Sequence, residues 1–96
     1  MNVTDNMSEK FVVGIERHVK EVHAYNTFTR TEKVSEAVEK HFFDELEDAM
    51  NAYKDAKYRE LKASVDAADP LRIEGLVWLE ARDDSGNAMI LDCEDI

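Results

Sequence analysis

The sequence predicts a small α+β domain in which one long helix packs on an antiparallel sheet, in the order β-β-α-β-β. In the middle of the chain, apolar residues recur every three to four positions, as on one face of a helix. On both sides of this region, shorter runs alternate apolar and polar residues and are rich in β-branched side chains, as strands are. Because 96 residues support one modest core, we expect a single domain over residues 1–96.

Residues 10–29 fit either two strands or one helix. As a helix, the segment would be amphipathic, and the fold would become α-α-β-β. As strands, it would turn near residues 16–20 and point inward the side chains of Phe11, Val13, Ile15, Val22, Ala24 and Phe28. Strands are favoured because β-branched residues are frequent here and because Gly14 would cost about 1 kcal/mol inside a helix. We expect residues 1–9 to form a flexible extension.

The central helix is expected to run from about residue 31 to residue 65. Its apolar stripe consists of Val34, Val38, Phe42, Leu46, Ala49, Tyr53, Ala56 and Leu61. Thr29 or Thr31 could supply the N-terminal cap, and Pro70 requires the helix to end before it. A helix of this length would be about 50 Å long. A small domain cannot cover all of it, so we expect a kink, a protruding end or a second subunit.

The residues after Pro70 predict a β-hairpin. Apolar residues alternate from Leu71 to Ala81, and a turn-forming cluster of Asp83, Asp84, Ser85 and Gly86 follows. Ala88 to Cys93 forms the second strand, and residues 94–96 form an acidic tail. Trp78 lies on the strand face opposite the expected core, so it needs cover from a second layer or from a partner.

The sequence carries no signature of catalysis, of a cofactor or of a metal site. His18 and His23 are five residues apart and would point to different sides of a helix or of a strand. Cys93 is a small strand residue rather than a nucleophile, and no serine lies in a nucleophile elbow. The glycines are isolated and cannot form a phosphate-binding loop. We therefore expect no catalytic residues, no cofactor and no metal, and not an enzyme.

The charge of the chain is strongly negative and unevenly distributed. The formal net charge is −10, with 13 acids and 10 bases up to Lys62 and 9 acids and 2 bases after it. An excess of acids repels the phosphates of nucleic acids and membranes and attracts basic surfaces. We expect neither direct nucleic-acid binding nor membrane binding.

The charge predicts a protein-binding module. The best interpretation is a stoichiometric inhibitor, of the phage or mobile-element type, that mimics nucleic acid and occupies the basic surface of a nucleic-acid-handling protein. Its binding residues would be Asp44, Glu45, Glu47, Asp48, Asp55, Asp83, Asp84, Asp92, Glu94 and Asp95. The alternative is an assembly protein that forms a homodimer through the long helix and the Trp78 face of the strand, with Tyr58 and Trp78 as interface residues.

The sequence also favours a cytoplasmic location. No apolar stretch is long enough to span a bilayer, and residues 1–10 lack the pattern of a secretory signal. Cys93 is the only cysteine, so no internal disulfide can form, which fits a reducing compartment.

Overall fold

The sheet consists of four antiparallel strands in the order β2-β1-β3-β4. The computed structural model describes residues 10–96. Strand β1 spans Phe11–Ala24, β2 Thr29–Phe43, β3 Leu71–Arg82 and β4 Ala88–Asp95, and helix α2, Leu46–Asp66, lies between β2 and β3. The predicted α+β class and the order β-β-α-β-β are confirmed.

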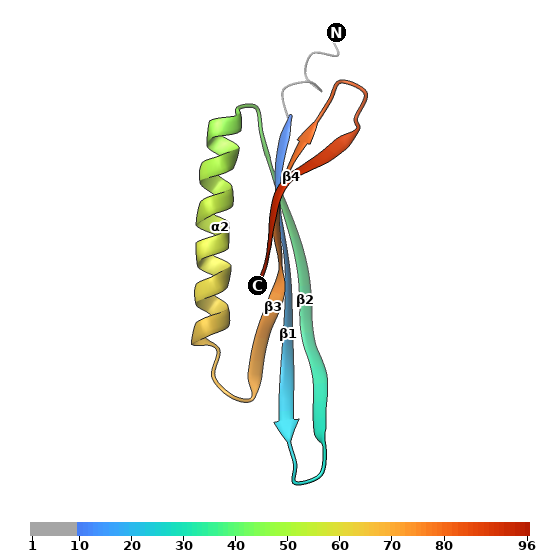
Figure 1. Ribbon diagram of the computed structural model, residues 1–96, viewed down its shortest axis with the longest axis vertical. Coiled ribbons are helices and arrows are strands. Elements are labelled where there is room, and N and C mark those ends of the chain that lie inside the picture. Colours follow the sequence, from blue (N-terminus) through green and yellow to red (C-terminus); the bar gives the residue numbers. More distant parts are fainter. Residues whose placement is uncertain (1–9) are drawn as a thin grey trace.

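Helix α2 covers one face of the sheet, as Figure 1 shows. It buries Ala49, Tyr53 and Ala56 at three- to four-residue spacing against Val13 and three other sheet residues. Those three are Ile15, Val77 and Leu79. The opposite face, called here the open face, is not covered by any other helix or strand of residues 10–96 (Figure 1).

The helix begins at Leu46, and the predicted start near residue 31 is wrong. Residues 29–43 form strand β2, and Glu45 is the N-cap in place of Thr29 or Thr31. Acidic Glu47 and Asp48 occupy the first turn, where the helix dipole favours negative charge. At 21 residues the helix is about 31 Å long. A helix of this length does not require a second subunit to cover it.

The first hairpin is longer than predicted. Its turn lies at residues 25–28, where Tyr25 and Phe28 stack with ring centroids 4.6 Å apart, and not at residues 16–20. Val22 and Ala24 belong to β1 rather than to a return strand. This hairpin extends past the end of α2 and gives the molecule its elongated shape of 63 × 21 × 18 Å (Figure 1).

The second hairpin follows the prediction closely. Gly86 in its turn has a φ of +84°, a conformation that glycine adopts without strain. Glu94 and Asp95 lie in β4 rather than in a separate tail, and Ile96 packs against the core. The extension expected over residues 1–9 lies outside the described residues.

Candidate functional site

The ten acids predicted to bind a partner are all exposed, but they do not form one continuous face. Six of them, called here the acidic end, precede or begin α2 or lie in the β3–β4 turn, and Figure 1 places both segments at the same end of the molecule. They are Asp44, Glu45, Glu47, Asp48, Asp83 and Asp84. Asp92, Glu94 and Asp95 lie on β4, and Asp55 lies farther along α2.

Asp55 and Asp92 lie on opposite sides of α2. Asp55 lines a hollow of about 310 Å³ with His41 and Arg59, on the side of strand β2. Asp92 lines a groove of about 300 Å³ between α2 and β4, with Tyr53 and Lys54. Asp55 is therefore separated from the β4 acids by the helix. Asp95 pairs with Leu76 and lies on the open face, whereas Asp92 and Glu94 pair with the core residues Leu79 and Val77.

Most of the basic residues form ion pairs with acids outside the predicted binding set. Eight of the twelve form ion pairs with acids outside the predicted set. These eight are Arg17, Lys20, Arg30, Lys33, Arg59, Lys62, Arg72 and Arg82. Within residues 10–96, none of the ten predicted acids takes part in an ion pair. The negative excess of the chain is therefore concentrated on these ten side chains.

Asp83 also has a structural role within the turn. Its carboxylate accepts hydrogen bonds from the backbone N–H groups of Ser85 and Asn87, both at 2.9 Å. The hydrogen bonds from Asn87 and Ser85 lower the pKa of Asp83 below its usual value. Asp83 thus fixes the turn that carries Asp84. The same backbone hydrogen bonds already stabilise the negative charge of Asp83.

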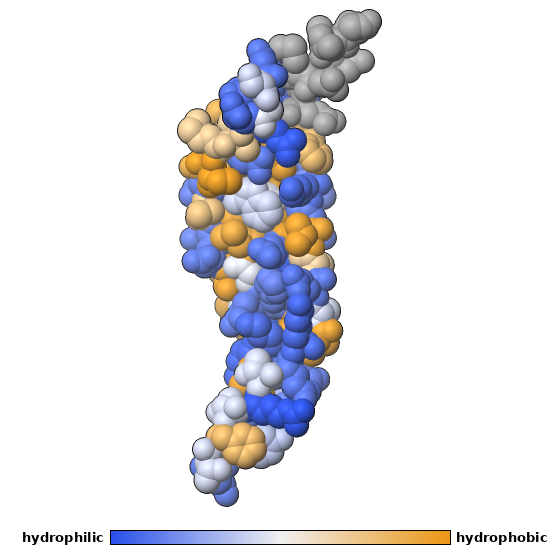
Figure 2. Space-filling model, turned by 90° about the vertical axis from the view of Figure 1, so that its right-hand side faces the viewer, coloured by the Kyte–Doolittle hydropathy of each residue, from blue (hydrophilic) through white to orange (hydrophobic). Residues whose placement is uncertain are grey.

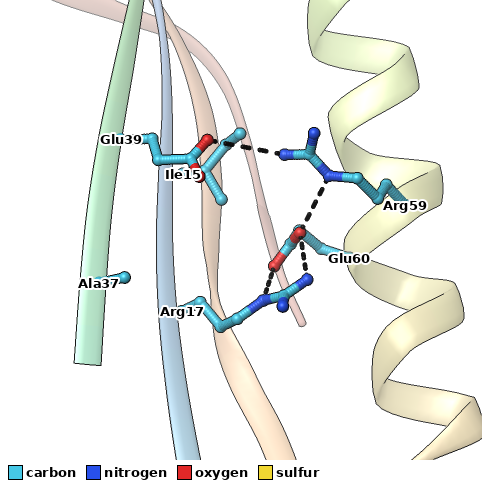
Figure 3. Close-up of a pocket in the computed structure, with 6 residues that line it drawn as sticks. All are labelled: Ile15, Arg17, Ala37, Glu39, Arg59 and Glu60. Carbon is cyan, nitrogen blue, oxygen red and sulfur yellow. Dashed lines mark hydrogen bonds and ion pairs between the residues drawn. The ribbon is translucent and has the colours of Figure 1, made fainter. Parts of the chain in front are cut away.

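An ion-pair network, shown in Figure 3, joins α2 to the first hairpin. The guanidinium of Arg17 binds Glu60 through two hydrogen bonds of 2.7 Å, and Arg59 reaches Glu60 at 3.3 Å and Glu39 at 3.9 Å. Glu60 is only 3% exposed and occupies the last buried position of the helix, where the sequence predicted Leu61. The hydrogen bond from Arg17 is the main cause that lowers the pKa of Glu60. This network is structural, because each guanidinium is already paired with a carboxylate.

The groove between α2 and β4 contains an unpartnered hydroxyl. Tyr53 is 4% exposed, and its hydroxyl oxygen has no hydrogen-bond partner among the described residues. Burial, followed by the nearby charges of Asp92 and β4, raises the pKa of Tyr53 to about 12. Leu46, Met50 and Leu91 also line the groove and are each at least 40% exposed.

We expect Tyr53→Phe to keep or raise the stability of the fold. Removing a buried hydroxyl that makes no hydrogen bond relieves its desolvation cost, so the free energy of unfolding should rise by up to about 1 kcal/mol. The proton of Tyr53 is held more tightly in the folded state, so wild-type stability should fall as the pH rises from about 10 to about 12. Urea unfolding across this pH range measures both effects. Tyr58→Phe, at a 71% exposed position, is the control and should change neither.

The open face carries a second concentration of apolar side chains. Figure 2 shows hydrophobic residues over the half of this face nearer the β3–β4 turn, and mainly hydrophilic residues over the other half. Val38, Phe42 and Ile90 on this face are between 43% and 56% exposed. Trp78 lies against Gly14 of the neighbouring strand and donates a hydrogen bond to Glu80 at 2.9 Å. Tyr58, the other predicted interface residue, is exposed on α2 and does not belong to this face.

All three histidines share a pattern that the sequence analysis missed. Each follows a glutamate by two residues on the same strand, and each Nε2 lies 3.3 Å from that glutamate, in the pairs Glu16–His18, Glu21–His23 and Glu39–His41. Two of the pairs have a third carboxylate nearby, Glu36 for His18 and Glu32 for His23. A Glu-x-His repeat in a strand was the available signal, because residues two apart share a face.

Comparison with known proteins gives no match, whether to a family model, to a curated protein or to a solved structure. In the part of the chain that the structure describes, α2 is the only helix of 18 residues or more. It is not apolar enough to cross a membrane.

Proposed function

We propose that the chain is a non-enzymatic protein-binding module whose acidic end engages a basic surface of another protein. The observation that carries this proposal is the separation of charge: most bases are paired with other acids, whereas the ten predicted acids are exposed and form no ion pair within residues 10–96. Unpaired carboxylates keep their long-range attraction for a basic partner and speed its encounter.

The finer form of the proposal is a stoichiometric inhibitor. Surfaces rich in arginine and lysine are the ones that proteins offer to DNA or RNA, and a rigid set of carboxylates competes for the same contacts. The acidic end is suited to this because its residues lie on the backbone of a helix start and of a hydrogen-bonded turn, which fixes where the side chains begin. An antagonist of the phage or mobile-element type would act in this way, in the cytoplasm.

Charge neutralisation tests the proposal. The variant Asp44→Asn/Glu47→Gln/Asp48→Asn should lose most partner capture from a lysate of the producing cells at low salt. Capture by the wild type should fall at high salt and in the presence of double-stranded DNA, because both compete for the same basic surface. The matched control Glu32→Gln/Asp66→Asn/Asp69→Asn changes the net charge equally, but at acids that are already ion-paired. Equal capture by the two variants, or no competition by DNA, would contradict the proposal.

The open face supports a second candidate function, homodimer formation. Apolar side chains that are 43% to 56% exposed occupy one face of a sheet that no other described element covers. In this role the dimer would form through Trp78 and its neighbours rather than through α2.

Sedimentation velocity tests the second candidate. Val38→Glu and Ile90→Glu place a charge on the open face at exposed positions, so they should turn a dimer into a monomer while the fold is kept. Val65→Glu makes the same change on α2, where the side chain is 81% exposed, and should leave the dimer intact. A wild-type protein that sediments as a monomer at high concentration would remove this candidate.

A further inference from the structure

We propose that Glu16, His18 and Glu36 bind a divalent cation of the zinc type. The three side chains come from two paired strands: Glu16 and His18 are two residues apart on β1, and Glu36 lies directly opposite His18 on β2. Their donor atoms all lie within 4.8 Å of one another. Strand pairing, rather than a flexible loop, holds them together (Figure 1).

The distances suit a tetrahedral ion. Nε2 of His18 and Oε1 of Glu16 are 3.3 Å apart. Two ligands of a tetrahedral zinc ion, each bonded at about 2.0–2.1 Å, are about 3.3 Å apart, so this pair already has the required spacing. One imidazole nitrogen with two carboxylates is a donor set that zinc and related transition metals accept and that calcium and magnesium do not select. A fourth position is left for water.

A further glutamate adds negative charge next to the site. Glu74 of β3 lies opposite His18 on the other side of β1, so His18 has a glutamate beside it on each neighbouring strand and another on its own. The second histidine cluster, Glu21, His23 and Glu32, has no such addition, because the pairing of β3 with β1 ends at Glu21. The site at His18 therefore has more negative charge around it, although Glu74 is not one of the three residues whose donor atoms lie within 4.8 Å of one another.

Two lysines hold these carboxylates when no ion is bound. Lys33 forms an ion pair with Glu36, and Lys20 donates a hydrogen bond to Glu74 at 2.7 Å. A bound ion would replace Lys33 at Glu36 and would connect β1 to β2 across the open face.

Calorimetric titration of the full, tag-free chain with Zn²⁺ tests the site, in a Cys93→Ser background that removes the exposed thiol. We expect one ion to bind with micromolar affinity, and His18→Ala or Glu36→Gln to weaken binding by more than about tenfold. Substitution of Co²⁺ should give the visible absorption of a tetrahedral site, which reports on geometry as well as affinity. Thermal unfolding should move to a higher temperature with zinc, because the ion binds only the folded arrangement.

His41→Ala is the matched control. His41 has the same 3.3 Å contact with a glutamate, Glu39, but no third donor close enough within residues 10–96. The His41→Ala variant should bind zinc with the same affinity as the Cys93→Ser parent. The proposal is overturned if zinc does not bind, if His41→Ala weakens binding as much as His18→Ala, or if only His23→Ala abolishes it. Circular dichroism of each variant shows that a loss of binding is not a loss of fold.

Discussion

Replacement of Glu60 by alanine should lower the free energy of unfolding by about 3 kcal/mol, one of the largest effects expected from a single side chain. Glu60 is 3% exposed and accepts two hydrogen bonds of 2.7 Å from Arg17. Without this carboxylate, the guanidinium of Arg17 has no partner at the boundary between helix and sheet. Arg17 is 36% exposed, so water can partly solvate it, which places the cost at the lower end of the range for broken buried pairs.

Two variants separate the pair from the rest of the network. Arg59→Ala removes only the contacts of a 57% exposed side chain and should cost less than about 1 kcal/mol. The double variant Arg17→Met/Glu60→Leu replaces the pair by apolar side chains and should recover most of the loss. Chemical denaturation gives all three values. A cost below about 1 kcal/mol for Glu60→Ala would show that the pair does not anchor the helix.

The same carboxylate should contribute to acid sensitivity. The hydrogen bond from Arg17 lowers the pKa of Glu60 in the folded state below 4.5, so its contribution is fully present above that pH. As the pH falls through the lowered pKa, Glu60 is protonated and the contribution is lost. The loss of stability between neutral pH and low pH should therefore be smaller in Glu60→Ala than in the wild type.

The order of the elements could be predicted from the sequence because each hydrophobic run has a distinct neighbourhood, but the start of the helix could not. Val34, Val38 and Phe42 are spaced by four residues, which fits one face of a helix and also one face of a strand, because four is a multiple of two. Pairing with β1 decides for the strand. A candidate helix cap such as Thr29 reflects only its nearest neighbours in sequence and does not indicate that the segment pairs with β1.

The candidate site was predictable only in part. All ten predicted acids are exposed, as charged residues usually are when they have no buried partner. The buried position of Glu60 was not expected, since an acid on the core stripe is tolerated only with a partner, and Arg17 lies 43 residues away in sequence. The cross-strand approach of Glu36 to His18 likewise depends on register, which the sequence did not determine.

Dimer formation through the open face and partner binding by the acidic end are compatible in one chain. A homodimer formed through Trp78 and Ile90 would leave α2 and its acidic start exposed, because the helix covers the opposite face of the sheet (Figure 1). Two acidic ends on one dimer would bind a basic partner more tightly than one, provided that both can reach it at the same time. Monomeric variants of the open face should then weaken partner capture without removing it.

Gly75→Ala should be the most damaging conservative substitution in the chain, with a loss of more than about 3 kcal/mol. A Cβ atom at Gly75 would lie 1.8 Å from the backbone oxygen of Glu16 on β1. No rotamer change can relieve a clash with backbone, so β1 and β3 would have to separate next to their hydrogen-bonded register. Thermal or urea unfolding measures the loss.

Gly14 provides a comparison for Gly75, because a Cβ atom there would meet a side chain instead of backbone. A Cβ atom there would lie 2.0 Å from the indole ring of Trp78, so Gly14→Ala should cost about 2 kcal/mol in the wild type. In a Trp78→Ala background the obstacle is gone, and the same change should cost less than about 1 kcal/mol. Gly75→Ala should cost the same in both backgrounds, because its obstacle is backbone. If truncation of Trp78 rescued Gly75→Ala as well, or if Gly75→Ala were harmless, the close approach of β1 and β3 would not be what requires these two glycines.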